Sequence, residues 1–215
     1  MIFADPHSRE EWLKCRCGGI GGSDAGCVVG QNKYRTNQEL WRQKVGIEVA
    51  KDISDKPSVA YGKKAEEHIR ALFALDYPQY CIDYHEYRMY CNDKHHFIYA
   101  TLDGEIYESN VMRGILEIKT TTIQNHVQWN EWDGGIPNSY YVQVLHQLIA
   151  TDLKFAILRA YIRYYKNSEL NATVRDYRID RSDVEDDINW LINKEVEFWK
   201  HVQSKTEPPL IMPEI

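Results

Sequence analysis

Two acidic residues and one lysine lie on two short apolar segments near the middle of the 215-residue chain. Asp103 opens the segment Asp-Gly-Glu-Ile-Tyr, and Glu117 and Lys119 lie in Gly-Ile-Leu-Glu-Ile-Lys. Because side chains alternate between the faces of a strand, Glu117 and Lys119 project to the same side. We expect Asp103 to meet them there if the two strands pair. Charges on an apolar sheet are costly unless they are paired or bound to a metal.

The chemistry of this group is that of a site for a hard cation. Carboxylate oxygens with few neutral donors suit Mg²⁺ or Mn²⁺, and a metal-bound water suggests phosphodiester hydrolysis. An Asp-Gly turn and a Glu-x-Lys pair are also common in solvated hairpins, where exposed charge pairs contribute little. The apolar flanks favour the site, and the hairpin interpretation stays open at this point.

A second group, near the N-terminus, has the composition of an anion site. The Gly-rich stretch 17–22 leads to Ser23 and to a short helix expected after Asp24, which ends at Gly30. A helix start offers backbone N–H groups and the positive end of the helix dipole. Ser23 would add a hydroxyl group, and Arg16 would add a positive charge. The alternative is an ordinary N-cap serine after a flexible loop.

Hydrophobic periodicity and capping residues predict the elements that position these side chains. The pattern is α+β, with a mixed central β-sheet flanked by helices. Expected helices cover 9–16, 37–45, 59–75, 124–130, 140–150 and 182–203. Expected strands cover 81–91, 100–107, 114–120, 155–164 and 172–179, and residues 96–100 lead into the second of these. Glu66 lies on the third of these helices, where a solvated surface residue is the alternative to a site residue.

Bulk properties narrow the class of protein. The formal charge of −6 argues against a simple basic nucleic-acid binder. The five cysteines are odd in number and include no Cys-x-x-Cys pair, so neither a disulfide framework nor a tetrahedral zinc site is indicated. No signal peptide or membrane-spanning apolar run is visible. We therefore expect a cytoplasmic protein without membrane association.

Five motifs occur in order along the chain. They are Trp12…Arg16-x-Gly-x-Ile20-x-x-Ser23, Tyr61-Gly-Lys-Lys-Ala-Glu66, Leu102-Asp103-Gly104, Leu116-Glu117-Ile118-Lys119 and Tyr141-Val-Gln143-Val. The combined pattern resembles the lambda-exonuclease or YqaJ-type viral recombinase branch of the PD-(D/E)xK nucleases, over about residues 10–165. The resemblance implies a restriction-endonuclease-like core and a single domain over 1–215, with a phosphate-pocket segment 8–46, a core 59–180 and a C-terminal helix 182–203.

The resemblance also implies the metal ligands. Asp103 and Glu117 would be the metal-binding carboxylates, and the carbonyl oxygen of Ile118 would be a backbone ligand. Glu66 would hold a second metal, directly or through water. The cofactor would be Mg²⁺, with Mn²⁺ able to substitute.

Further roles follow from the same resemblance. Lys119 would orient and help activate the attacking water, or stabilise charge on the phosphate, and Gln143 would position the water or Lys119. Arg16 and Ser23 would form the pocket for a 5′-terminal phosphate. Leu102 stands at the position before Asp103 where the family's motif has a proline. His146 is interpreted as a packing residue.

The implied activity is degradation of one strand of linear double-stranded DNA, 5′ to 3′, which leaves a 3′ single strand. The implied partners are double-stranded DNA ends, a single-strand annealing protein and, as in known relatives, two further copies in a homotrimer. The setting would be a phage or prophage protein in a bacterial host. Two alternatives remain: a PD-(D/E)xK endonuclease, and a non-catalytic module that binds DNA ends or proteins.

Overall fold

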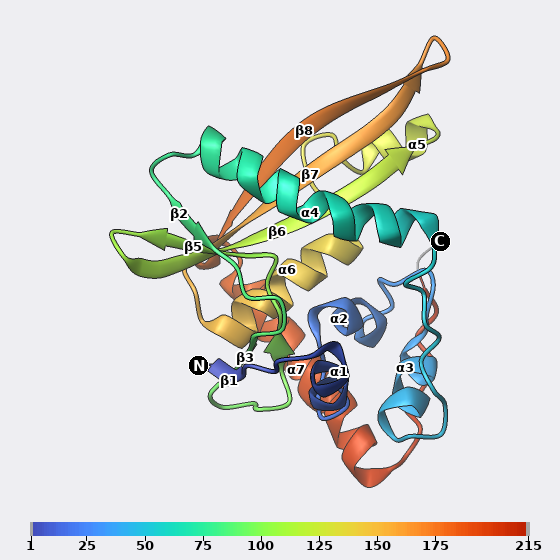
Figure 1. Ribbon diagram of the computed structural model, residues 1–215. Coiled ribbons are helices and arrows are strands. Elements are labelled where there is room, and N and C mark those ends of the chain that lie inside the picture. Colours follow the sequence, from blue (N-terminus) through green and yellow to red (C-terminus); the bar gives the residue numbers. More distant parts are fainter. Residues whose placement is uncertain (1, 214–215) are drawn as a thin grey trace.

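A five-stranded mixed sheet forms the centre of the molecule, in the order β2-β5-β6-β7-β8 (Figure 1). A computed structural model describes residues 2–213. Strands β6 and β7 are parallel, and the other neighbours are antiparallel. The strands are β2 (Cys81–Asp83), β5 (Gly104–Glu108), β6 (Val111–Ile123), β7 (Phe155–Lys166) and β8 (Glu169–Asp180). The prediction of an α+β fold with a mixed central sheet is confirmed.

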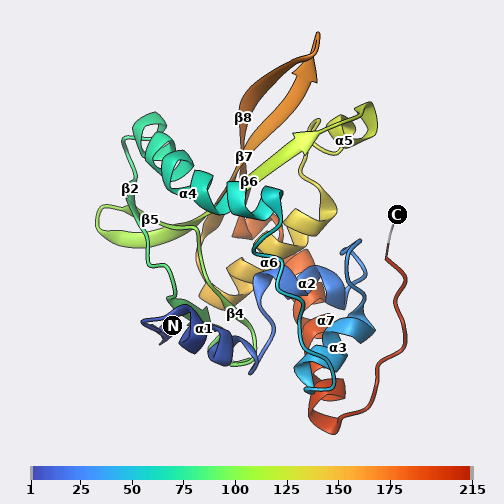
Figure 2. The same cartoon turned by 45° about the vertical axis from the view of Figure 1, so that its right-hand side comes forward.

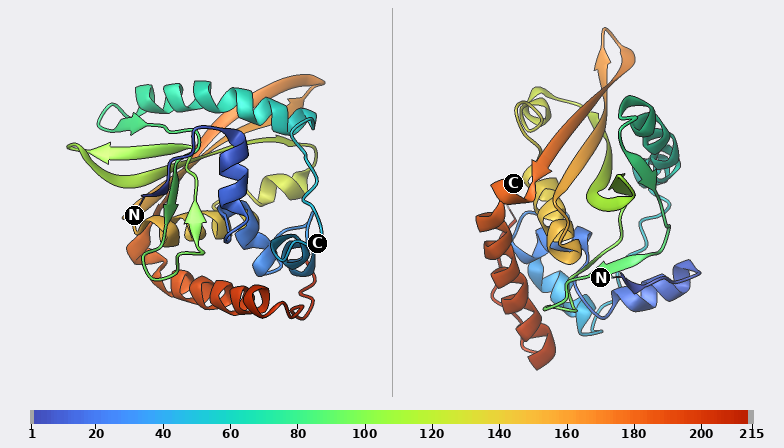
Figure 3. Two further views of the ribbon diagram at one scale, coloured as in Figure 1. Left: turned by 60° about the horizontal axis from the view of Figure 1, so that its bottom comes forward. Right: turned by 90° about the vertical axis from the view of Figure 1, so that its left-hand side faces the viewer.

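Helices cover both faces of this sheet. Helix α4 (Pro57–Asp76) packs on one face through Ile69 and Phe73, and α6 (Asn138–Thr151) packs on the other through Leu145 and Leu148. Helix α7 (Glu185–Ser204) follows a short 3₁₀ turn and lies outside α6. The right-hand view of Figure 3 shows these layers in the order α7, α6, sheet and α4.

Three further helices and a small sheet lie beyond one end of the central sheet (Figure 2). Helices α1 (Arg9–Arg16), α2 (Gly22–Val28) and α3 (Asn37–Lys44) come from the first part of the chain. A three-stranded sheet has the order β1-β3-β4, with β1 at Ile2–Ala4, β3 at Met89–Cys91 and β4 at Tyr99–Ala100. Helix α5 (His126–Asn130) follows β6.

The hairpin β5–β6 leaves part of strand β6 without a partner on one side. Ser109 and Asn110 both have positive φ values, which suit the tight turn that joins the two strands. The pairing of β5 with β6 ends at Gly104↔Leu116, whereas β6 continues to Ile123 beside β7 alone. Asp103, which precedes β5, therefore lies beside the second half of β6, where β6 has no antiparallel partner. The candidate site lies at this unpaired edge.

Several predicted boundaries are wrong. The expected strand 81–91 is divided into β2 and β3 of two different sheets, because the chain turns after Asp83, whose carboxylate accepts the N–H of Tyr84 at 2.8 Å. Helix α4 begins earlier than predicted, at Pro57, where proline suits the first turn. Helix α7 begins later, at Glu185, because a 3₁₀ turn over Arg181–Asp183 precedes it.

Residues 2–213 contain neither a disulfide bond nor a helix that could span a membrane. No disulfide joins the five cysteines, which agrees with the sequence analysis. No helix in this part of the chain combines the length and apolar character needed to cross a membrane.

Candidate functional site

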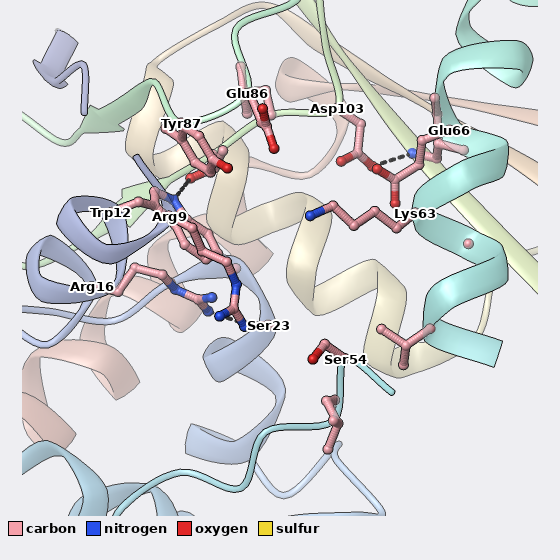
Figure 4. Close-up of a pocket in the computed structure, with 18 of the residues that line it drawn as sticks. Arg9, Trp12, Arg16, Ser23, Ser54, Lys63, Glu66, Glu86, Tyr87 and Asp103 are labelled. Carbon is pink, nitrogen blue, oxygen red and sulfur yellow. Dashed lines mark hydrogen bonds between the residues drawn. The ribbon is translucent and has the colours of Figure 1, made fainter. Parts of the chain in front are cut away.

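A cleft of about 830 Å³ lies between α4, α6 and the first two helices. Figure 4 shows Glu66 and Asp103 on one side of it and Arg16 and Ser23 on the other. Lys119 and Gln143 also line it. The structure therefore brings the two groups predicted from the sequence, the carboxylate–lysine group and the anion site, into one cleft.

Glu117 and Lys119 share a face of β6 and form an ion pair. Lys119 Nζ lies 2.6 Å from Glu117 Oε1, and the side chain of Glu117 is only 2% exposed. Gln143 joins both: its Oε1 accepts from Lys119 Nζ at 2.9 Å, and its Nε2 donates to Glu117 Oε1 at 2.7 Å. Burial lowers the pKa of Lys119, but the carboxylates of Glu117 and Asp103 outweigh it and raise that pKa. Lys119 is therefore held as a cation.

Asp103 is fixed to the open edge of β6. Its Oδ2 accepts the backbone N–H of Ile118 at 2.8 Å, a bond that the end of strand pairing at Gly104 makes available. The carbonyl oxygen of Asp103 accepts from Arg70 Nε at 2.5 Å. Arg70 in turn stacks on Tyr84, with its guanidinium carbon 3.6 Å from the ring centroid. Helix α4 thus helps to set the backbone position of Asp103.

The three carboxylates repel one another. Burial raises the pKa of Asp103 well above its usual value, and the charges of Glu117 and Glu66 raise it further. Burial and Glu117 also raise the pKa of Glu66, although Arg70 and Lys119 oppose the shift. The site therefore carries excess negative charge, which a divalent cation bound to hard oxygen ligands would relieve. These donors fit Mg²⁺ or Mn²⁺ chemistry.

A second group could also hold a metal ion. Within residues 2–213, ligand atoms of Asp83, His85 and Glu105 all lie within 4.8 Å of one another. Asp83 and Glu105 face each other across the β2–β5 pair. Glu105 already accepts from the hydroxyl groups of Tyr90 at 2.6 Å and Tyr107 at 2.9 Å. The sequence analysis missed this group, since the pairing of β2 with β5 is what creates it.

The predicted anion site has its two side chains in contact. Arg16 Nη2 donates to Ser23 Oγ at 3.1 Å, and the Arg16 guanidinium carbon lies 4.4 Å from the centroid of the Trp12 ring. Ser23 is exposed to the cleft. The predicted start of α2 is wrong, because the helix begins at Gly22 and Ser23 lies inside its first turn.

Asp24 explains this earlier start. Its Oδ2 accepts the N–H of Gly21 at 3.2 Å, so that backbone group is occupied. Lys44 Nζ lies 2.8 Å from the same oxygen, and Arg35 Nη2 lies 2.5 Å from Oδ1. Burial raises the pKa of Asp24, but Lys44 and Arg35 outweigh it and hold the pKa well below its usual value. The two cations therefore neutralise the buried carboxylate of Asp24, which adjoins Ser23 in the sequence.

Two residues that hold the site side chains were not assigned to it from the sequence, and a third residue, His146, was interpreted correctly. Gln147 Nε2 donates to Glu117 Oε2 at 2.6 Å, and Arg70 holds the Asp103 carbonyl. The i, i+4 spacing of Gln143 and Gln147 was the available signal for the first of these. His146 is fully buried and bonds Glu195 and the Tyr99 carbonyl, as expected for a packing residue.

Two solved exonuclease structures share this arrangement of elements. An alkaline exonuclease (LHK-Exo) from Laribacter hongkongensis matches with a TM-score of 0.67 and 19% identity, over 92% of this chain and 94% of that chain. A phage related exonuclease from Haemophilus somnus 129PT matches with a TM-score of 0.57 and 12% identity, over 87% and 96%. The fold is therefore the one found in these exonucleases.

Sequence comparison gives the family. The model of the YqaJ-like viral recombinase domain matches residues 11–154, and the chain belongs to that family. The uncharacterized protein YqaJ of Bacillus subtilis (strain 168) is 30% identical over 195 residues. That match covers 89% of this chain and 56% of the relative. The chain thus spans little more than half the length of this relative.

Proposed function

We propose that this protein is a metal-dependent exonuclease that degrades one strand of linear double-stranded DNA, 5′ to 3′, from a 5′-phosphorylated end. One observation carries the proposal: a single cleft is lined by Asp103 and Lys119, whose ammonium group pairs with the buried Glu117, and also by Arg16 and Ser23. The first group suits phosphodiester hydrolysis, and the second suits a terminal phosphate. Together they support an enzyme that binds the phosphate at a strand end and hydrolyses a phosphodiester bond next to that end.

The carboxylates would hold the metal. Asp103, Glu117 and the carbonyl oxygen of Ile118 are the proposed ligands, and Glu66 would hold a second ion directly or through water. Mg²⁺ is the proposed cofactor, with Mn²⁺ able to substitute. When bound, the ion would act as a Lewis acid and would lower the pKa of a water ligand.

Lys119 and Gln143 act beside these ligands. Because Lys119 is held as a cation by Glu117 and Asp103, it suits stabilisation of charge on the phosphate better than removal of a proton. Gln143 bonds both Lys119 and Glu117. It therefore fixes the ammonium group with respect to the carboxylate, and this is its proposed role.

Arg16 and Ser23 would bind the terminal phosphate through a charged donor and a hydroxyl donor. Hydrolysis of the bond between phosphorus and the 3′ oxygen releases the first nucleotide and leaves a new 5′-phosphate on the shortened strand. Each cut therefore regenerates the group that this pocket would bind. Repeated digestion of one strand follows from the same two sites.

The wider setting is also part of the proposal. LHK-Exo has been crystallised in complex with dAMP, and a deoxynucleotide of this kind is the product expected here. A single-strand annealing protein is the proposed partner for the 3′ strand, and a homotrimer is the proposed assembly. The proposed location is the cytoplasm of a bacterium that carries the phage or prophage.

The test compares linear and covalently closed DNA. Purified protein with Mg²⁺ should convert linear duplex with 5′-phosphates to nucleotides and a residual single strand, and should leave a closed plasmid intact. A chelator should stop the reaction. Cutting of the closed plasmid would replace this proposal with an endonuclease, and no cutting in either Mg²⁺ or Mn²⁺ would favour a binding module.

A further inference from the structure

Gln147 is a second amide on α6 that contacts Glu117, one helical turn after Gln143. Its side chain is almost fully buried, with the residue 1% exposed. Its Nε2 donates to Glu117 Oε2 at 2.6 Å. The two amides therefore hold different oxygens of one carboxylate: Gln143 binds Oε1, and Gln147 binds Oε2.

The two carboxylate oxygens of Glu117 differ in the number of lone pairs that hydrogen bonds leave free. Oε1 receives two donors, the Lys119 ammonium at 2.6 Å and the Gln143 amide at 2.7 Å, which together use both of its lone pairs. Oε2 receives the neutral amide of Gln147. Oε2 therefore keeps one lone pair, and no cation among its hydrogen-bond partners neutralises its share of the charge.

We propose that Gln147 is a positioning residue that fixes Oε2 of Glu117 as the oxygen offered to the metal ion. This inference rests on the proposed function, because it specifies how Glu117 serves as a ligand there. A neutral donor suits the role. An ammonium at this position would neutralise Oε2 and compete with a metal ion, whereas an apolar side chain would leave the carboxylate free to rotate about its last bond.

The other end of the Gln147 amide shows that packing does not explain this residue. Its Oε1 is buried and has no hydrogen-bond partner within the described part of the chain. A buried acceptor without a donor destabilises the fold. An apolar side chain of similar length, such as methionine, would remove that cost but would leave Oε2 of Glu117 without the donor that holds it. A residue that lowers stability while it holds a site carboxylate is typical of functional positions.

The experiment measures metal binding in the absence of DNA. Calorimetric titration with Mn²⁺ is compared between the wild type and Gln147→Met, with Leu148→Met as the control. Leu148 is the next residue of α6, is fully buried and packs in the core cluster beneath the sheet. Gln147→Met should weaken Mn²⁺ binding about 10- to 100-fold, the usual effect of removing a residue that orients a metal ligand. Its circular dichroism spectrum should stay that of the folded protein, and Leu148→Met should bind Mn²⁺ as the wild type does.

Equal Mn²⁺ affinity in the wild type and Gln147→Met would overturn the inference. A second variant, Gln147→Leu, controls for a packing defect specific to methionine. If neither variant folds, Gln147 is needed for stability and the claim that it positions Glu117 is overturned. The absence of Mn²⁺ binding by the wild type would also overturn it. The proposed function fails separately: a wild type that binds Mn²⁺ but cuts no DNA, with weaker binding in Gln147→Met, would leave the inference standing.

Discussion

Lys119 and Glu117 form an ion pair in which the ammonium nitrogen lies 2.6 Å from a carboxylate oxygen that is shielded from solvent. The alternation of β6 places both on the face that α6 covers, where Gln143 bonds each of them. The pair is therefore fixed in geometry before any substrate arrives. Such preorganisation is the main source of electrostatic stabilisation in enzyme sites.

Replacement of Lys119 by methionine should reduce turnover by about 10²- to 10³-fold, the usual loss when one preorganised donor is removed. Glu117 would keep its bonds to Gln143 and Gln147, so the variant should fold. Single-turnover rates on linear duplex, together with circular dichroism, measure the two effects. Wild-type turnover in Lys119→Met would remove Lys119 from the mechanism.

Replacement of Arg16 by alanine should reduce the preference for 5′-phosphate over 5′-hydroxyl ends by about 10- to 100-fold, because one charge-assisted bond is lost. The cutting rate on 5′-hydroxyl ends should fall less than the rate on 5′-phosphate ends. Initial rates on the two substrates give the ratio. Arg42→Ala is a matched control, since Arg42 lies on α3 and pairs with Glu207. Equal losses on both substrates in Arg16→Ala would refute the pocket assignment.

Asp103→Asn should stabilise the metal-free protein. Burial and the neighbouring carboxylates raise the pKa of Asp103, so in the absence of metal its ionisation costs folding free energy, and this cost grows as pH rises above the unfolded value of 3.8. Asparagine removes the charge and can still accept the Ile118 N–H. Thermal melts in a chelator at neutral pH should show a higher midpoint.

The same substitution should weaken the response to metal. An amide is a poorer ligand than a carboxylate for Mg²⁺, and a weaker ligand gives less stabilisation by mass action. Melts with added Mg²⁺ should therefore shift upward in the wild type and less in Asp103→Asn. A lower metal-free midpoint together with an unchanged Mg²⁺ shift would contradict both parts of this prediction.

The buried pair His146–Glu195 should make stability depend on pH. His146 Nδ1 lies 2.6 Å from Glu195 Oε1 and Nε2 lies 2.9 Å from the Tyr99 carbonyl, so both ring nitrogens face acceptors. Burial lowers the pKa of His146, but Glu195 outweighs it and raises the pKa above 6.5. The stabilisation is therefore complete below pH 6.5 and is lost as pH rises through the folded-state pKa.

Thermal melts between about pH 6 and about pH 9 measure this loss. In Glu195→Gln the carboxylate that raises the pKa is absent, so the midpoint should be lower at the acid end and should fall less with pH. Parallel curves for the wild type and Glu195→Gln would contradict the assignment.

Local sequence patterns predict the part of the site that lies on one hairpin. Strand alternation puts Glu117 and Lys119 on one face, and the turn at Ser109–Asn110 brings Asp103 opposite β6. The same reasoning predicts the strands 155–164 and 172–179, because each carries its own periodicity. These features depend on residues close in sequence.

Features that depend on distant packing are not predicted. Arg70 reaches the Asp103 carbonyl only because α4 crosses the sheet at that point, and Asp83 and Glu105 come together only through the β2–β5 pair. The alternation over 81–91 suggests one strand, but the chain leaves the central sheet after Asp83 and joins another. Periodicity within a segment carries no information on which sheet it enters.

A duplex with unequal ends tests the central claim most directly. One strand carries a 5′-phosphate and the other a 5′-hydroxyl, and each strand is labelled separately at its 3′ end. With Mg²⁺, the account predicts that the 5′-phosphorylated strand is shortened progressively from its 5′ end while the other strand persists, and that Arg16→Ala reduces the difference between the strands. Equal loss of both strands, or shortening from the 3′ ends, would contradict it.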